Sequence, residues 1–365
     1  MIALELTAGL VLLVFGAEVL VRGASRIAAA LGITPLVIGL TVVAFGTSSP
    51  ELAVSVMAGL NGQPGLAIGN VVGSNIFNVL LILGVSSLIA PLVVAQQLIR
   101  LDVPLMIGAS LLTWGFARDG SIRPWEGLVL LVIGIVYTAF IIRFSRREKS
   151  REVIEEYRRE YGKAVGVAAG KTWHSVLYVA FGLAMLLIGS RWLVHGAVVI
   201  ARNLGVSDLV VGLTIIAAGT SLPEVATSVI ASVRGERDIA VGNVVGSNIF
   251  NLLFILSLAA LSGGGIPVEA SAIRFDIPVM VAVAVACLPI VFTGRRLDRW
   301  EGLVLLLYYG AYTAYIVLAG MRHRSLDALS TAMVWFVIPL TLLTLTVVVA
   351  REVRSKRPST RSGVV

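Results

Sequence analysis

The chain has 365 residues, of which 57% are hydrophobic and only 14% are charged. This balance excludes a soluble globular protein, because a soluble core cannot bury so much apolar surface, and it predicts many spans of a lipid bilayer. The formal net charge of +8 does not indicate nucleic-acid binding, because the basic residues lie in loops between apolar runs. The lone cysteine, Cys287, excludes an internal disulfide framework.

Apolar segments of about 20 residues, the length that crosses a bilayer, follow one another along the chain. The first has no basic N-terminal region and continues past residue 21, so we expect a retained helix rather than a cleaved signal peptide. Five spans are predicted at 3–29, 34–60, 64–91, 101–117 and 124–142. Five more are predicted at 174–202, 206–233, 237–262, 272–292 and 300–319, and an eleventh at 331–350.

The spans divide the chain into two halves. The halves are separated by a charged segment, residues 143–171. It is expected outside the bilayer, because it holds nine Lys and Arg and five Glu. We predict an all-α membrane protein of ten core helices plus an eleventh, in four parts. These are a first five-helix repeat at 1–142, a basic cytoplasmic linker at 143–173, a second five-helix repeat at 174–320, and the extra helix with a basic tail at 321–365.

A stretch of 46 residues, 39–84, occurs twice, and its second copy at 212–257 lies 173 residues later without an insertion. The copies share 28 identical positions, concentrated on Gly, Asn, Ser, Thr, Pro and Glu rather than on interchangeable apolar residues. Each copy holds one carboxylate, Glu51 or Glu224, in an apolar segment where an ionisable group is expensive and by default functional. Two duplicated sites of this kind predict a transporter.

The number of spans between the copies sets their relative orientation. Because each half has five spans, the second half enters the membrane from the opposite side, which makes the halves an inverted repeat. With the N-terminus outside and the C-terminus in the cytoplasm, 22 of the 29 Lys and Arg residues fall on the cytoplasmic side. The positive-inside rule therefore predicts this orientation for a multi-pass protein of the cell membrane.

The motif GTSSPE at residues 46–51 returns as GTSLPE at 219–224. In a helix, the Thr and Ser of each motif precede the Glu by four and three residues, so two hydroxyls and a carboxylate share one face. The Pro removes a backbone donor and the Gly permits unwinding, which frees carbonyls around Ala44 and Thr47, and around Ala217 and Thr220. Such oxygens suit Ca²⁺ and Na⁺, and neither motif contains the Cys or His that softer metals prefer.

A second motif, GNVVGSNIFN, at 69–78 and 242–251, places polar side chains along one helix face. Its candidate ligands are Ser74 and Asn78 in the first copy and Ser247 and Asn251 in the second. Amides hydrogen-bond across membrane helices with modest energy. Four further asparagines are therefore interpreted as packing or orienting residues: Asn70, Asn75, Asn243 and Asn248.

Together these paired blocks resemble the α-repeats of the Ca²⁺/cation antiporter superfamily, in particular the prokaryotic sodium/calcium exchangers. The resemblance covers roughly residues 1–320. It implies ten helices, of which helices 2, 3, 7 and 8 surround the ions while the long helices 1 and 6 move across them. It also implies Na⁺/Ca²⁺ antiport by alternating access, with no cofactor and no enzymatic activity. We expect the chain to function as a monomer.

The resemblance implies a role for each matching residue. The shared Ca²⁺ and Na⁺ ligands are Glu51 and Glu224, and Asn78 and Asn251 flank the centre. The outer sodium site is expected to combine Thr47, Ser48, Ser74 and the Ala44 carbonyl. The inner sodium site is expected to combine Thr220, Ser221, Ser247 and the Ala217 carbonyl.

Position 251 departs from the family pattern, because such exchangers often carry Asp where this chain has Asn251. Two central carboxylates then remain, which leaves the stoichiometry, proton coupling and any K⁺ requirement open. An H⁺/Ca²⁺ or K⁺-dependent exchanger is the first alternative, and a passive cation channel is a more distant one. An intramembrane hydrolase would need a His or Lys base beside Ser48 or Ser221, and neither repeat supplies one.

Other charged residues in apolar segments have structural interpretations. Glu18 and Arg191 occupy equivalent repeat positions, and each is expected to extend toward the membrane interface. Asp102 and Asp276 are expected to cap the N-termini of their helices, where a negative charge suits the helix dipole. Two tryptophans are interpreted as interfacial anchors: Trp125 and Trp300.

Overall fold

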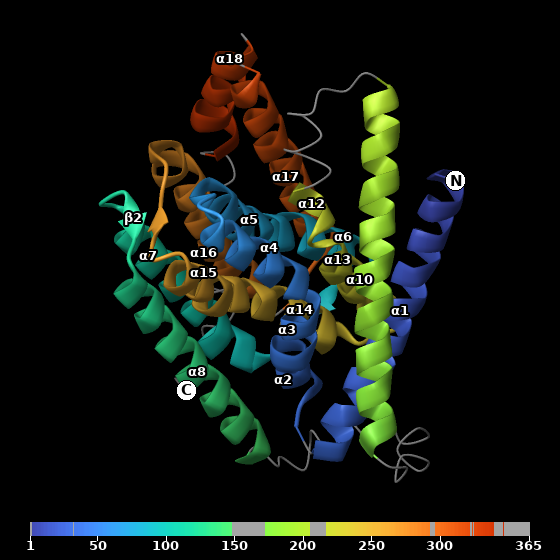
Figure 1. Ribbon diagram of the computed structural model, residues 1–365. Coiled ribbons are helices and arrows are strands. Elements are labelled where there is room, and N and C mark those ends of the chain that lie inside the picture. Colours follow the sequence, from blue (N-terminus) through green and yellow to red (C-terminus); the bar gives the residue numbers. More distant parts are fainter. Residues whose placement is uncertain are drawn as a thin grey trace, which may run out of the picture.

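The computed structural model describes residues 2–31, 33–147, 172–204, 217–292, 296–321, 323, 325–338 and 346. Helices make up almost all of this part of the chain (Figure 1). Among the described residues, seven helices are long and apolar enough to cross a membrane, and a helix pair bent by 50° forms a further span. The expected all-α membrane fold is confirmed. The spans predicted at 206–233 and 331–350 lie partly outside the described residues.

The helices of the first repeat run from α1 to α8, with three π-helical turns between them. They are α1 (Ile2–Leu31), α2 (Pro35–Ile38), η1 (Gly39–Val43), α3 (Ala44–Thr47), α4 (Ser49–Leu60), α5 (Pro64–Phe77), η2 (Asn78–Leu83), α6 (Gly84–Ile89), η3 (Leu98–Asp102), α7 (Val103–Ala117) and α8 (Pro124–Arg147). Proline stands in the first turn of α2, α4, α5 and α7. This position suits it at the starts of α2 and α5, where the backbone N–H that proline lacks has no partner.

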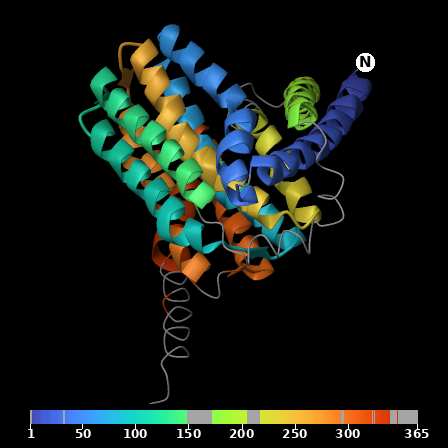
Figure 2. The same ribbon diagram turned by 90° about the horizontal axis from the view of Figure 1, so that it is seen from below.

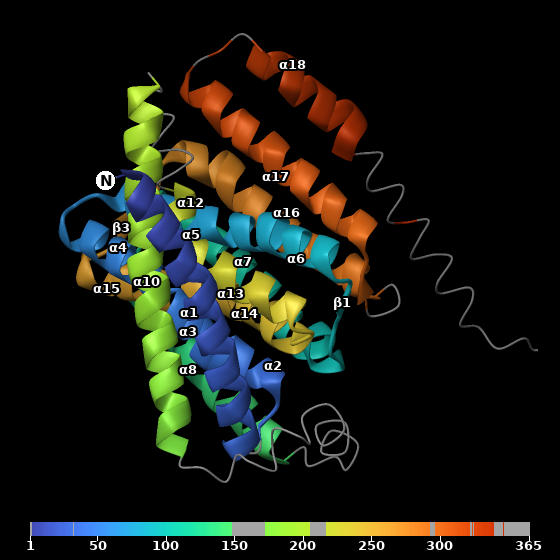
Figure 3. The same cartoon turned by 90° about the vertical axis from the view of Figure 1, so that its right-hand side faces the viewer.

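The second repeat follows the same order. Its elements are α10 (Thr172–Asn203), α12 (Ala217–Gly219), α13 (Leu222–Val233), α14 (Arg237–Phe250), η5 (Asn251–Ile255), α15 (Leu256–Ser262), η6 (Ala272–Asp276), α16 (Ile277–Phe292) and α17 (Arg299–Gly320). Two short elements, α18 (Ser325–Ala332) and η7 (Met333–Val337), come after α17. Figure 3 shows α18 lying along α17. Gly62 and Gly235 hold equivalent positions after α4 and α13, and both adopt a positive φ, of 67° and 81°, that glycine tolerates best.

Two short antiparallel ladders tie the repeats together. Strand β1 (Leu92–Val93) pairs with β4 (Arg296–Leu297), and β2 (Ser121–Ile122) pairs with β3 (Ile266–Pro267). Each ladder joins a loop of the first repeat to a loop of the second. The two halves are therefore held together by backbone hydrogen bonds in addition to helix packing.

The duplicated Trp-Glu-Gly sequence starts α8 and α17. Glu126 Oε2 accepts a hydrogen bond from the Arg123 backbone N–H at 2.7 Å, and Glu301 Oε2 accepts one from Asp298 N–H at 2.7 Å. These carboxylates thus satisfy backbone donors at the helix starts. The tryptophan before each of them is about half exposed.

Glycines bring α1 and α10 into close contact along their lengths. A Cβ atom added at Gly16 would lie 2.9 Å from Met185 Cβ, and one added at Gly182 would lie 2.6 Å from Leu20 N. Gly9 and Gly189 face each other in the same way. Small residues allow backbones to approach closely in membranes. The two long helices therefore form one tightly packed pair, at one edge of the bundle when seen from below (Figure 2).

The capping role expected for Asp102 and Asp276 is wrong. The π-helical turns η3 and η6 come directly before α7 and α16, so neither residue stands at a free helix start. Asp102 is fully buried and accepts a hydrogen bond from the Tyr137 hydroxyl at 2.8 Å. Asp276 accepts one from Tyr312 at 3.2 Å. Each aspartate thus links its helix to the helix that follows.

Glu18 makes two ion pairs that the sequence does not predict. It pairs with Arg22 of the same helix at 2.5 Å and with Arg234, which follows α13. Its side chain is 18% exposed, whereas both arginines are more exposed. The ion pair with Arg234 therefore connects α1 to the second repeat.

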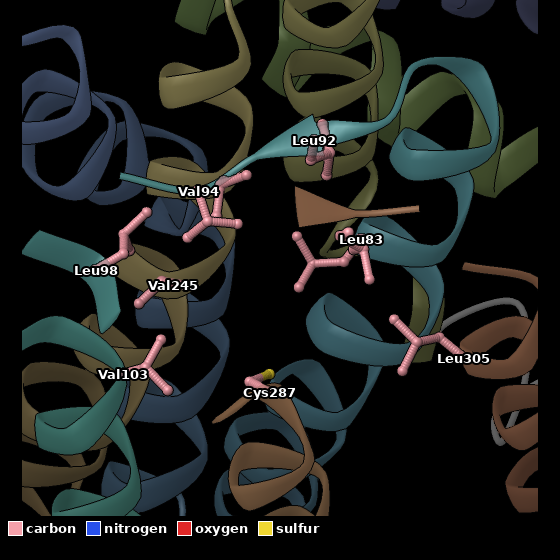
Figure 4. Close-up of a pocket in the computed structure, with 10 residues that line it drawn as sticks. Leu83, Leu92, Val94, Leu98, Val103, Val245, Cys287 and Leu305 are labelled. Atoms are coloured by element: carbon pink, nitrogen blue, oxygen red, sulfur yellow. The ribbon is translucent and has the colours of Figure 1, made fainter. Parts of the chain in front are cut away.

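A small cavity of about 20 Å³ lies beneath the β1–β4 ladder (Figure 4). Its lining is apolar except for one thiol: Leu83, Leu92, Val94, Leu98, Val103, Val241, Val245, Cys287, Leu297 and Leu305. The Cys287 thiol donates to the Val283 carbonyl within its own helix, at 3.6 Å. A cavity of this lining offers no oxygen ligands, so it is a packing gap rather than an ion site.

Candidate ion-binding site

The GTSxPE motif breaks its helix in both repeats. In the first, α3 ends at Thr47 and α4 begins at Ser49, and the axis bends by 50° between them. Ser48 at the break has φ −81° and ψ 11°, and Ser221 has nearly the same values, −89° and 7°. Glu51 and Glu224 thereby fall in the first turns of α4 and α13. The positive end of a helix dipole favours a carboxylate there.

The serine of each motif bonds to the carboxylate of the other motif. Ser48 Oγ donates to Glu224 Oε1 at 2.8 Å, and Ser221 Oγ donates to Glu51 Oε1 at 2.8 Å. All four side chains are at most 1% exposed. These crossed hydrogen bonds join the two motifs in a single site.

Ser74 also reaches the second motif. Ser74 Oγ lies 3.2 Å from Ser221 Oγ, which in turn donates to Glu51. The expected outer sodium site groups Ser74 with Thr47 and Ser48, and this grouping stays a prediction. Each carboxylate accepts a hydrogen bond from the serine of the other half.

Two backbone carbonyls are expected as ligands, those of Ala44 and Ala217. The Ala44 carbonyl is not free, because it accepts from Ser48 N–H at 3.0 Å and lies 3.4 Å from Thr47 Oγ1. Ala217 begins the short helix α12, just before the second motif.

Asn78 and Asn251 are held by a reciprocal amide network. Asn78 Nδ2 donates to Asn248 Oδ1 at 3.0 Å, and Asn251 Nδ2 donates to Asn75 Oδ1 at 3.0 Å. All four residues are buried. Each flanking residue also begins a π-helical turn, η2 or η5, a local widening that is frequent at functional sites. The amide nitrogens of Asn78 and Asn251 are thus engaged, and their oxygens are left over.

Five buried oxygens of the predicted ligand set have no hydrogen-bond partner. They are Glu51 Oε2, Glu224 Oε2, Ser247 Oγ, Asn78 Oδ1 and Asn251 Oδ1. Buried polar atoms are nearly always paired, so such a group of acceptors indicates a ligand. Carboxylate, hydroxyl and amide oxygens are the donors that Ca²⁺ and comparable hard cations take. Among the described side chains, no group of three or more His, Cys, Asp and Glu gathers as a soft-metal site would.

Comparison with known proteins identifies the family. The sodium/calcium exchanger protein family matches residues 2–143 and 174–318. The chain belongs to this family. The sodium/calcium exchanger MaX1 of Methanosarcina acetivorans is 33% identical over 341 residues, covering 85% of this chain and 96% of that protein. The inner membrane protein YrbG of Escherichia coli is 38% identical over 287 residues, covering 77% of this chain and 85% of the relative.

The fold agrees with a solved exchanger. The structure of the sodium-calcium exchanger NCX_Mj superposes with a TM-score of 0.73 at 30% identity, covering 85% of this chain and 97% of that one. The resemblance stated from the repeats is therefore confirmed. The family consists of cation/Ca²⁺ antiporters, so this exchanger is a multi-pass membrane transporter.

Two features of this exchanger's site have no clear signal in the sequence. The crossing of the serine–carboxylate bonds depends on how the two halves pack, which a repeat alignment does not give. The π-helical turns begin at Asn78 and Asn251, yet the following residues read as ordinary apolar helix. The inverted arrangement of the repeats is the one hint that side chains of opposite halves meet.

Proposed function

We propose that this exchanger moves Ca²⁺ against Na⁺, and that Glu51 and Glu224 are the ligands that both ions share. The crossed pair of serine–carboxylate bonds carries this proposal, because it brings one carboxylate of each repeat into one buried site. One oxygen of each carboxylate is bonded and the other has no partner. A cation between the two free oxygens would contact both halves.

Charge explains why such a site favours exchange over leak. Two carboxylates neutralise one Ca²⁺, and the same two charges attract Na⁺ when Ca²⁺ has left. An empty site would keep both charges in a low-dielectric interior, which is costly. The transition between its two states is therefore easier with ions bound. Competition for the same carboxylates couples the two fluxes.

The pair α1–α10 is the proposed moving part. Side chains of α10 press on the glycine of each motif: Leu183 lies against Gly46, where an added Cβ would come within 2.6 Å, and Val194 lies against Gly219. A slide of the glycine-packed pair along the bundle would change both contacts together. Access would then alternate between the two sides, as in other transporters built from inverted repeats. We also propose, from the basic loops, that the N-terminus is outside and the C-terminus cytoplasmic.

Ion flux in proteoliposomes tests the proposal. An outward-directed Na⁺ gradient should drive uptake of radioactive Ca²⁺ above its equilibrium level, and dissipating that gradient should stop the uptake. Ca²⁺ that only runs down its own gradient would contradict antiport and indicate a channel. Uptake that follows a pH gradient, or that needs K⁺, without responding to Na⁺ would contradict Na⁺ coupling.

A further inference from the structure

Two asparagines outside the proposed ligand set connect the motifs. Asn70 lies on α5 and Asn243 on α14, at equivalent positions of the repeats. Each bonds to both repeats at once, which simple packing of neighbouring helices does not require. We propose that Asn70 and Asn243 are positioning residues that turn the motif threonines, so that the threonine hydroxyl oxygens face the transported cations as acceptors. This inference rests on the proposed function.

The amide nitrogen of each asparagine is fixed within its own repeat. Asn243 Nδ2 lies 3.4 Å from the Glu224 carbonyl oxygen and 2.9 Å from Ser228 Oγ. Asn70 Nδ2 makes the equivalent contacts, at 3.2 Å to the Glu51 carbonyl oxygen and at 2.9 Å to Ser55 Oγ. A backbone carbonyl only accepts hydrogen bonds, so the atom that faces it must be the amide nitrogen. The orientation of both amides is thereby set.

The amide oxygen of each asparagine faces the other repeat. Thr47 Oγ1 donates to Asn243 Oδ1 at 3.1 Å, and Thr220 Oγ1 donates to Asn70 Oδ1 at 3.4 Å. A hydroxyl has a single proton, so a threonine that gives it to the asparagine keeps only lone pairs for any other partner. For Thr47 the Asn243 oxygen is the nearer acceptor, because the Ala44 carbonyl lies 3.4 Å from the same hydroxyl. The asparagine therefore favours the arrangement in which the threonine is an acceptor on its remaining side.

All four motif hydroxyls follow the same rule. Ser48 and Ser221 give their protons to the carboxylates, and the two threonines give theirs to the asparagines. What these groups leave for a ligand is a set of lone pairs. Such a set fits a hard cation and repels an anion. The asparagines thus accept the threonine protons, as the glutamates accept the serine protons.

A double-mutant cycle on the full-length protein in proteoliposomes tests this role. The readout is the Na⁺ concentration that half-saturates Ca²⁺ exchange, for T47V, N243L and the double variant. Loss of one hydrogen bond predicts about a five- to tenfold rise for each single variant. Because Asn243 acts through Thr47, the double variant should match T47V within about twofold.

Two controls use the same N243L substitution. Thr220 is hydrogen-bonded to Asn70 rather than to Asn243. The changes that T220V and N243L cause in the half-saturating Na⁺ concentration should therefore multiply in the double variant. The conservative T47S keeps the hydroxyl, so N243L should still raise the half-saturating Na⁺ concentration in that background. If N243L does not fold, the equivalent cycle of T220V with N70L, at partly buried positions, gives the same test.

The outcomes separate the two proposals. Suppose that the unaltered protein exchanges Na⁺ for Ca²⁺, but that the effects of T47V and N243L on the half-saturating Na⁺ concentration multiply fully. The asparagine is then a packing residue and the positioning role is wrong. The same conclusion follows if N243L lowers only the maximal rate. If the unaltered protein shows no Na⁺-driven Ca²⁺ flux, the proposed function fails, and the positioning role fails with it.

Discussion

The two repeats agree in the bonds that join their motifs and differ away from them. The serine–carboxylate bonds are equal in length in the two halves, and the two central asparagine contacts also match. Farther along, Arg234 after α13 bonds to Glu18 of α1, whereas its repeat counterpart after α4 is the uncharged Asn61. The symmetry is therefore kept in the bonds between the two motifs. It is relaxed at the ion pair between α13 and α1.

A second difference lies on the two broken helices themselves. Thr227 on α13 is fully buried and its hydroxyl has no partner, while the equivalent position on α4 is Val54. Ser86 on α6, which packs against α13, likewise has an unpartnered buried hydroxyl where the other repeat has Ala259. The contact between α13 and α6 is thus more polar than the equivalent contact between α4 and α15. An exchanger built this way need not hold its two states at equal free energy.

The largest expected effect comes from the carboxylates, and it should be symmetric. E51Q and E224Q should each reduce Na⁺-driven Ca²⁺ uptake more than about a hundredfold, because each removes one charge from a buried pair of ligands. The measurement is the initial rate of uptake into proteoliposomes, with equal protein incorporation. Full coupled exchange in either variant would show that the two glutamates are not equally required.

The serines should show a smaller and again symmetric effect. S48A and S221A each remove a hydrogen bond to a carboxylate, which predicts about a tenfold weaker apparent affinity for Ca²⁺. We expect the two variants to agree within about threefold in Ca²⁺ titrations of exchange. A strong loss in one and none in the other would show that a single repeat holds the ion.

The glycine packing should also respond equally in the two halves. G16A and G189A hold equivalent positions, and each adds a methyl group against the partner helix: 2.9 Å from Met185 Cβ in the first case and 2.7 Å from the Gly9 carbonyl in the second. Overpacking of this kind predicts a fall of about 5 °C in unfolding temperature in detergent. G73A and G108A are matched controls, because a Cβ there meets nothing within 4 Å. Equal losses in the controls would remove this explanation.

The smallest effect should reveal the asymmetry. R234N gives the second repeat the residue of the first and removes the ion pair with Glu18. A partly exposed ion pair of this kind is worth less than about 1 kcal/mol, so the expected change is about twofold. Because the pair biases one of two states, the half-saturating Na⁺ concentration should rise on one side of the membrane and fall on the other. Equal changes on both sides would contradict a bias.

The sequence predicts the fold because the repeat has 28 identical positions of 46 without an insertion and the spans are strongly apolar. The candidate ligands can also be predicted from the sequence, since carboxylates such as Glu51 and Glu224 are unusual in apolar segments. What failed depends on tertiary packing. The sequence does not predict that each serine bonds to the carboxylate of the other motif, and it predicts a cap at Asp102, because neither the crossing of the broken helices nor the π-helical turn before α7 leaves a pattern in the sequence.

We propose that the two halves build one ion site. Equilibrium dialysis of purified protein with radioactive Ca²⁺ tests this most directly, since it counts bound ions without any transport step. We expect one Ca²⁺ per chain, displaced by Na⁺, and no high-affinity binding in either E51Q or E224Q. Two Ca²⁺ per chain, with one retained in each single variant, would show two independent sites and contradict the claim.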